Sequence, residues 1–252
     1  MLFINLIQTN LQTSIIGKNI EYFPFTDSTN DDALDLILKN KAEDGMVIIT
    51  DHQKKGRGRR GNQWFSSPGN NLTFSLVLKK YQQSKSSLIA ILSGVAIVRG
   101  IKKFSNIECQ LKWPNDIMLN DKKIGGILIE TKKINELIYL VIGIGLNVNE
   151  QEIPSDLSNI ASSLRIEDSK PVQREPLLAF ILNEFEQLHQ SDSDEWISYW
   201  KKYCNHMNKK IKFHDNDDII QGEFAGIDSD GSALLNINSK QVKISSGVLE
   251  EL

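Results

Sequence analysis

The segment Asp51–Trp64, DHQKKGRGRRGNQW, carries five cations within the seven positions 54 to 60 and ends on an aromatic residue. Such a charged run cannot form part of a core. Glycine has a backbone that can adopt unusual conformations and can approach a ligand closely. We interpret the segment as a loop that wraps around an anion beside a flat group. The alternative is a solvated basic loop with no ligand.

Residues 56 to 61, GRGRRG, match the G-x-G-x-x-G pattern of dinucleotide-binding loops. That pattern requires a helix to begin directly after the glycines, so that its N-terminus meets a pyrophosphate. Here Ser66–Asn71 and an alternating strand follow instead. The sequence also lacks the Gly-Lys-Ser/Thr of a Walker loop, and Gln63 stands where a kinase-type loop has an apolar residue. The sequence therefore predicts that the arginines themselves bind the anion, and that the loop is mobile until a ligand orders it.

A second group of reactive residues, Lys112-Trp113-Pro114-Asn115-Asp116, lies between two expected strands. If residues 117–119 and 124–131 form a hairpin, Asp116 and Lys123 face each other at its open end. The carboxylate would hold Mg²⁺ or position the lysine, and the lysine would reach an anionic ligand. A surface ion pair is the alternative. The glycines after Lys123 favour the site, because they leave room for a flat ligand.

Two further stretches offer polar groups beside expected secondary structure. Ser28, Thr29 and Asn30 precede a predicted helix and are residue types that cap helices. Gly143 and Gly145 interrupt an apolar strand that ends at Asn147, whose amide suits the edge of a purine. A turn asparagine is an equal alternative for Asn147.

Composition limits the functions that these groups can serve. The 252 residues carry a formal net charge of −3, so the basic segment is local, which argues against general nucleic-acid binding. Cys109 and Cys204 lie far apart and form no metal or redox motif. There is no signal-peptide pattern, and the longest apolar run, Leu137–Leu146, is too short to span a bilayer. We expect a cytoplasmic protein.

The order of predicted elements indicates an α+β protein with a mixed sheet rather than a doubly wound fold. Helices are expected over 31–45, 86–104, 174–190 and 194–204, and strands over 2–7, 46–50, 72–78, 110–113, 117–119, 124–131 and 137–148. We expect a catalytic domain over residues 1–207. Short strands in residues 208–252 predict a small β-barrel domain.

Taken in order, these motifs resemble the biotin protein ligases. The matching pieces are Asp27-Ser28-Thr29-Asn30, Gln53 with GRGRRG and Trp64, KWPND at 112–116, Lys123 with GGILIE, and Gly143 to Asn147. The resemblance is strong over residues 21–150, and the tail is similar to the family's SH3-like C-terminal domain. It implies a catalytic domain like those of class II aminoacyl-tRNA synthetases.

The resemblance also implies a reaction. Biotin and ATP, with Mg²⁺, would form biotinyl-5′-AMP and pyrophosphate, and a lysine of a biotin carboxyl carrier protein, as in acetyl-CoA carboxylase, would then accept the biotin. Only 27 residues precede Ser28, too few for the DNA-binding domain of bifunctional relatives, so we expect neither a repressor nor a DNA partner. No membrane partner is expected, and monomer and homodimer both stay open.

Site roles follow from the resemblance, position by position. The biotin site would be formed by Ser28, Thr29, Asn30, Gln53, Gly56, Arg57, Gly58, Arg59 and Lys123. The ATP site would contain Trp64 over the adenine side, Asn147 at the purine edge, Arg59 and Lys123. Catalysis would fall to Lys123, Arg59 and Asp116, with Asp116 as the candidate Mg²⁺ ligand. Asn62-Gln63 and Gly125 depart from the usual family residues. A lipoate ligase and a nucleic-acid-binding module are the competing interpretations.

Overall fold

The computed structural model describes residues 1–79, 86–215, 218–238 and 240–252. Its α-helices are α1 (Ile4–Asn10), α2 (Thr29–Leu38), α3 (Ser86–Ser105), α4 (Leu164–Asp168), α5 (Arg174–His189) and α6 (Ser193–Tyr203). The larger sheet contains β1 (Ile20–Phe23), β2 (Val47–Thr50), β3 (Leu72–Lys79), β4 (Gln110–Lys112), β5 (Asp116–Leu119), β6 (Lys122–Ile134) and β7 (Leu137–Leu146). The smaller sheet contains β8 (Lys210–Asp215), β9 (Asp218–Ile227), β10 (Ala233–Ile237), β11 (Lys240–Ile244) and β12 (Val248–Glu251). The α+β class with a mixed sheet is confirmed.

The seven-stranded sheet has the strand order β1-β2-β3-β7-β6-β5-β4. Only the β1–β2 pair is parallel; the other neighbours are antiparallel, so short connections suffice between most of them. The basic segment joins β2 to β3, and the KWPND motif joins β4 to β5. Strand order therefore brings both connections to one end of a single sheet.

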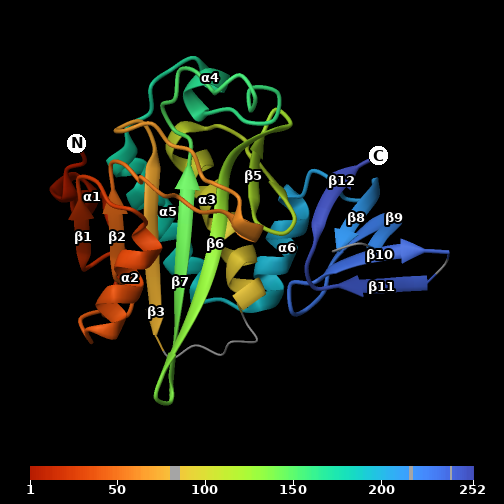
Figure 1. Cartoon of the computed structure of the whole chain (residues 1–252), viewed down its shortest axis with the longest axis horizontal. Coiled ribbons are helices and arrows are strands. Elements are labelled where there is room, and N and C mark those ends of the chain that lie inside the picture. The colour runs from red at the N-terminus through yellow and green to blue at the C-terminus, as the bar shows by residue number, and fades with distance from the viewer. Residues whose placement is uncertain (80–85, 216–217, 239) are drawn as a thin grey trace.

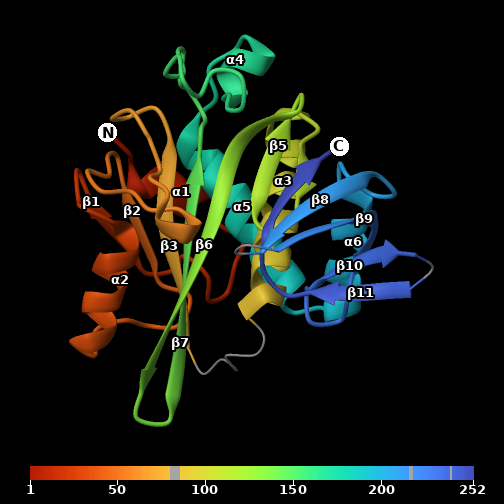
Figure 2. The same cartoon turned by 45° about the vertical axis from the view of Figure 1, so that its right-hand side comes forward.

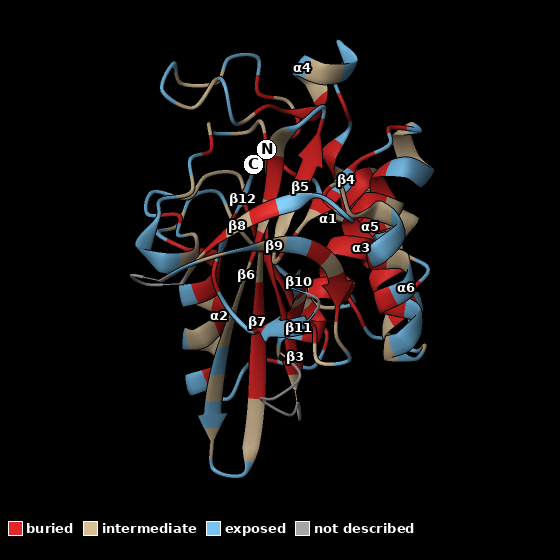
Figure 3. Ribbon diagram, turned by 90° about the vertical axis from the view of Figure 1, so that its right-hand side faces the viewer, coloured by how far each residue is buried: buried red, intermediate tan, exposed pale blue. Residues whose placement is uncertain are grey.

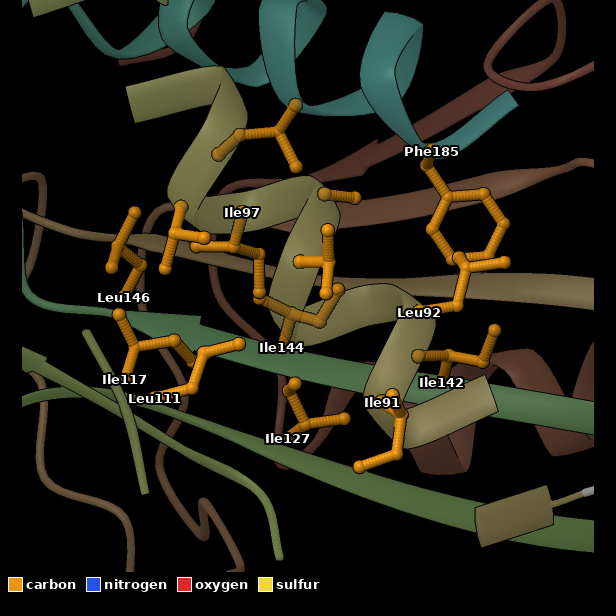
Figure 4. Close-up of a cluster of buried hydrophobic side chains, with 14 of the residues drawn as sticks. Ile91, Leu92, Ile97, Leu111, Ile117, Ile127, Ile142, Ile144, Leu146 and Phe185 are labelled. Carbon is orange, nitrogen blue, oxygen red and sulfur yellow. The ribbon is translucent and has the colours of Figure 1, made fainter. Parts of the chain in front are cut away.

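One face of this sheet carries the main core, with α3 and α5 stacked behind it (Figure 1). Side chains alternate along a strand, so Ile142 and Ile144 of β7 point toward Ile91 and Leu92 of α3 (Figure 4). These residues are at most 4% exposed. Gly143 lies between the two isoleucines in sequence and therefore faces the opposite side of the sheet.

The opposite face is covered only in part. Ala33 and Ile37 of α2 pack there against Val77 and Val141 in a second, smaller cluster. The end of the β6–β7 hairpin projects beyond the sheet and is exposed or half-buried (Figure 3). The uncovered part of this face lies beside α2, next to the basic segment.

The smaller sheet is antiparallel, with the order β11-β10-β9-β8-β12, and lies beside α6 (Figure 2). Its core is continuous with that of the larger sheet. Trp113 packs on Phe213 with 5.2 Å between ring centroids, and its indole Nε1 donates to the carbonyl oxygen of Gly231 at 3.0 Å. Gly231 has φ +85°, and a Cβ there would lie 3.1 Å from the Ser87 carbonyl carbon. The KWPND motif is thus tied directly to the second sheet.

The strand predicted at residues 2–7 is wrong, because the structure forms α1 over Ile4–Asn10. A short apolar run cannot distinguish strand from helix by periodicity, and contact with α5 decides the conformation. Strands β1 and β12 and helix α4 were not predicted. No helix of the described residues has the length and apolar character needed to cross a membrane.

A buried histidine in the junction between α6 and β8, His206, is expected to make the stability of the fold depend on pH. His206 is fully buried between Trp200 and Phe224, and burial lowers its pKa to about 3 from 6.5. Below pH 6.5 the unfolded chain binds a proton at this residue and the folded chain does not, so stability falls as the pH falls. The expected loss between neutral pH and about pH 5 is about 2 kcal/mol.

Urea unfolding at both pH values checks this prediction in the wild-type protein and in His206→Phe. The variant should lose less stability on acidification than the wild type. Equal losses in the two proteins would show that His206 does not carry the effect.

Candidate active site

A cavity of about 280 Å³ lies on the uncovered face of the large sheet. It is bounded by the start of α2, the basic segment, the KWPND motif, strands β6 and β7, and residues 247–249 of the smaller sheet. Among the described residues, its lining contains five cations, Arg57, Arg59, Arg60, Lys112 and Lys123, but a single carboxylate, Asp116. Three motifs that are distant in sequence therefore share one strongly positive cavity.

The basic segment forms a small hairpin above this cavity. The Trp64 amide donates to the Gly56 carbonyl at 2.9 Å, and the Gly58 amide donates to the Asn62 carbonyl at 2.7 Å. The tip is a single 3₁₀ turn, Arg59–Gly61. At Gly56 a Cβ would lie 2.6 Å from the Trp64 carbonyl oxygen, so this glycine is required for strand-like pairing. We call residues 56–64 the basic hairpin.

The start of α2 presents buried hydroxyl and amide groups to the cavity. Ser28 occupies the N-cap position, but its hydroxyl makes no capping hydrogen bond. The Gln53 side-chain oxygen accepts from the Thr29 amide at 2.9 Å and from the Thr29 hydroxyl at 3.2 Å. The Ser75 hydroxyl lies 2.8 Å from the Thr29 hydroxyl. The Ser28 hydroxyl is therefore not committed to the helix, while Thr29 and Gln53 are fixed in orientation.

Asn30 is held by partners from two strands. Its Nδ2 donates to Glu130 at 2.6 Å, and its Oδ1 accepts from the Ser75 hydroxyl at 2.6 Å. A Cβ on Gly143 would lie 2.4 Å from the same Oδ1. Gly143 thus clears the space that Asn30 occupies, and Glu130 sets which way the amide faces.

Trp64 lies against two glycines of the sheet. A Cβ on Gly145 would lie 2.4 Å from the indole Cε2, and one on Gly126, its cross-strand partner, 3.7 Å from Cζ3. The indole Nε1 is buried, with no hydrogen-bond partner among the described residues. Trp64 therefore lines the cavity with an aromatic face and a donor that a ligand can use. Its predicted contact with adenine stays a prediction.

Asp116 and Lys123 meet across the β5–β6 hairpin as the spacing predicts, with 2.6 Å between Oδ1 and Nζ. The Lys123 backbone is fixed from the other side, because its amide donates to the Ile160 carbonyl and its carbonyl accepts from the Ser162 amide. The lysine is thus held at the rim of the cavity by a carboxylate and by a distant segment. The geometry favours lysine positioning as the role of Asp116.

Arg59 differs electrostatically from Arg57. Arg57 makes a bidentate pair with Asp31, both contacts at 2.6 Å, and this guanidinium holds the pKa of Asp31 below its usual value. Arg59 instead donates to the neutral amide oxygen of Asn115 at 3.2 Å. Burial, followed by the charge of Arg60, lowers the pKa of Arg59. The charge of Asp116 opposes this shift, but the hydrogen-bond partner of Arg59 is an amide. A half-buried guanidinium whose direct partner is neutral is a ready site for an anion.

Like Gly56 among the predicted site residues, Asn147 lies outside the cavity lining. It is 8% exposed, and its Nδ2 donates to the Ser162 carbonyl at 3.0 Å. Its Oδ1 is buried, with no partner among the described residues. The predicted role of Asn147 at a purine edge stays a prediction.

Several residues that shape the site were given no role of their own from the sequence, although Lys112, Asn115 and Glu130 lie within the matching motifs. These are Asp31, Thr73, Ser75, Lys112, Asn115 and Glu130, together with residues 247–249. Thr73 and Ser75 alternate with buried apolar residues in β3, a pattern that ordinarily indicates a solvent-facing side. Here that side faces the cavity. For residues 247–249 the sequence held no signal, because only tertiary packing brings the smaller sheet to the site.

Comparison with known proteins identifies the family of the chain that forms this cavity. The model of the biotin/lipoate A/B protein ligase family matches residues 22–147, and that of the biotin protein ligase C-terminal domain matches residues 206–248. The bifunctional ligase/repressor BirA of Bacillus subtilis is 31% identical over 97% of this chain and 77% of its own length. The chain belongs to the biotin/lipoate A/B protein ligase family.

Other relatives agree. BirA of Escherichia coli is 32% identical over 87% of this chain and 70% of its own. A biotin protein ligase from Aquifex aeolicus, solved in complex with biotin and ATP, superposes with a TM-score of 0.81. It is 26% identical, and the match covers 93% of this chain and 99% of that one. Family membership thus extends over both sheets.

The contact of Trp64 with Gly145 gives a test of the site geometry. Gly145→Ala places a methyl group on the indole and should displace Trp64, whereas Gly126→Ala on the neighbouring strand meets mainly the mobile end of Lys123, at 3.3 Å. The emission of Trp64 is isolated by subtracting the spectrum of the same protein carrying Trp64→Phe from that of the protein with Trp64. It should shift to longer wavelength in Gly145→Ala and stay unchanged in Gly126→Ala; identical spectra in both would contradict the described contact.

Proposed function

We propose that this chain is a biotin protein ligase, which activates biotin with ATP and transfers it to a lysine of a carrier protein. The observation that carries the proposal is that one cavity is lined both by neutral polar groups and by cations. Fixed hydroxyl and amide groups at the start of α2 suit a neutral ring, and Arg59 and Lys123 suit adjoining anions. The family matches agree with this substrate pair.

In the first step a biotin carboxylate oxygen attacks the α-phosphorus of ATP. The new acyl–phosphate bond forms as the bond to pyrophosphate breaks, giving biotinyl-5′-AMP. Both reactants are anions, so their approach is opposed by repulsion that the site must offset. We assign this role to Arg59 and Lys123, with Asp116 keeping the ammonium of Lys123 in place.

In the second step the neutral amine of a carrier lysine attacks the acyl carbon, AMP leaves, and an amide bond forms. The mixed anhydride must survive until the carrier arrives. We assign its protection to the basic hairpin, which lies over the cavity and excludes water when a ligand orders it. A biotin carboxyl carrier domain is the partner that this chemistry requires.

Mg²⁺ fits the site as a companion of ATP rather than as a metal held by the protein alone. The described residues contain no cluster of three or more histidine, cysteine, aspartate or glutamate side chains suited to a metal. Mg²⁺ commonly binds through one or two carboxylates plus substrate phosphates. Asp116, the carboxylate among the described lining residues, would be that ligand as the alternative to its positioning of Lys123; the ion would neutralise phosphate charge.

Other parts of the proposal rest on the sequence. We assign residues 1–207 to the catalytic domain and 208–252 to the small domain, and a reducing cytoplasmic setting agrees with two free cysteines. The absence of repressor activity and the choice between monomer and dimer stay predictions.

Pyrophosphate exchange tests the function. The purified protein should exchange labelled pyrophosphate into ATP in the presence of biotin, because adenylate formation is reversible. Lipoate should not support exchange, which separates this chain from lipoate ligases of the same family. Exchange with lipoate alone would assign the other substrate, and no exchange by folded protein with either acid would refute the proposal.

Lys123→Ala and Arg59→Ala test the assigned roles. Each should lower the rate of biotinyl-AMP formation by about 100-fold, as loss of one transition-state donor typically does. Lys122→Ala is the matched control. It removes the same charge from the neighbouring residue, whose side chain lies outside the cavity lining. Single-turnover formation of the adenylate is the measurement. An equal rate in Lys123→Ala and Lys122→Ala would remove Lys123 from the reaction.

A further inference from the structure

The basic hairpin is supported over the cavity at two points. On one side the Arg57 guanidinium contacts Asp31 of α2, and on the other Arg59 contacts Asn115 of the KWPND motif. The hairpin therefore spans the cavity, with one arginine at each end of the span. These two contacts differ in kind.

The contact of Arg57 is ionic and bidentate. Both of its terminal nitrogens lie 2.6 Å from the Asp31 carboxylate, and the second of them lies 3.6 Å from Glu130. The same Glu130 oxygen accepts from Asn30 at 2.6 Å. Planar pairs of this kind hold both position and orientation. Arg57 is thus linked to two carboxylates, one of which also fixes a side chain of the cavity.

Neighbouring contacts strengthen the support on the α2 side. Lys55 pairs with Asp27 at 2.8 Å, and its backbone amide donates to the Asp27 carbonyl at 2.9 Å. The contact of Arg59 with Asn115, by comparison, is a single hydrogen bond of 3.2 Å to a neutral group. An anion entering the cavity competes with a carboxylate for Arg57 but only with an amide for Arg59.

We infer that Asp31 is a positioning residue that anchors the basic hairpin through Arg57, so that Arg59 alone exchanges its protein partner for the ligand. Arg57 keeps its carboxylate partner in the free and ligand-bound states. Arg59 leaves Asn115 for the reacting carboxylate and phosphate. The anchored side acts as the fixed end about which the hairpin opens and closes.

Asp31→Asn is the direct test, and Asp35→Asn is the matched control. Asp35 lies one turn further along α2, carries the same charge, is similarly exposed, and pairs with Lys39 away from the hairpin. In ligand-free protein, hydrogen exchange at the amides of Gly58 and Trp64 should be about fivefold faster in Asp31→Asn, the size expected for loss of one ion pair. It should be unchanged in Asp35→Asn, and both variants should keep the wild-type melting temperature.

Salt and a conservative variant separate an ion pair from a general structural effect. Exchange at these amides should quicken with ionic strength more strongly in the wild type than in Asp31→Asn, because salt screens the Arg57–Asp31 pair, which the variant lacks. Asp31→Glu should restore slow exchange at least in part. Asp31→Asn with Arg57→Gln should be no worse than either alone, as expected for directly coupled residues. Equal exchange in Asp31→Asn and Asp35→Asn would overturn the inference.

The kinetic arm rests on the proposed function. Release of biotinyl-AMP should be about fivefold faster in Asp31→Asn, with KM for biotin raised and the single-turnover rate at saturating biotin unchanged, because Arg59 and Lys123 are intact. A fall in that rate with unchanged KM would contradict the anchoring role. The exchange experiment in ligand-free protein needs no substrate, so its outcome is independent of whether the chain uses biotin.

Discussion

Under the proposed function, the structure depends on one electrostatic constraint: a single cavity must hold two anions in contact. The described residues of its lining include five cations and one carboxylate, on a protein whose net charge is negative. Those cations would repel one another without compensation. Asp31 and Asp116 neutralise Arg57 and Lys123 in the free protein. Arg59, held by an amide, keeps the charge that is available to a ligand. Under the proposed function, this difference in partners makes Arg59 the group to which an anion would bind.

A second constraint is steric, and the sheet meets it with glycine. The α3 side of β6 and β7 needs bulk to fill a core, whereas the other side needs space. Alternation along a strand satisfies both at once, with isoleucines toward the helices and Gly143 and Gly145 toward the cavity. Asn30 and Trp64 occupy the cleared space. The strands that carry the core residues therefore also form the floor of the site.

Much of this was predictable from the sequence, for identifiable reasons. Strong periodicity located α3, α5 and β3, and the hairpin spacing placed Asp116 beside Lys123. Local patterns could not show that Asp31 would pair with Arg57, or that Gly247 would reach the cavity, because both contacts depend on tertiary packing. Helix α1 was mistaken for a strand, since seven residues are too few for periodicity to decide. The alternation of polar and apolar residues in β3 indicates that Thr73 and Ser75 face solvent, whereas in the structure they face the site.

The central claim is that the basic hairpin closes over the activated ligand with Arg59 as the exchanging contact. Hydrogen exchange at the amides of residues 56–64, followed with and without biotin and ATP, tests it most directly. We predict that both substrates together slow exchange across the hairpin, and that they do so much less in Arg59→Ala. Exchange that is unchanged by the substrates in wild-type protein, under conditions where the adenylate forms, would contradict the account.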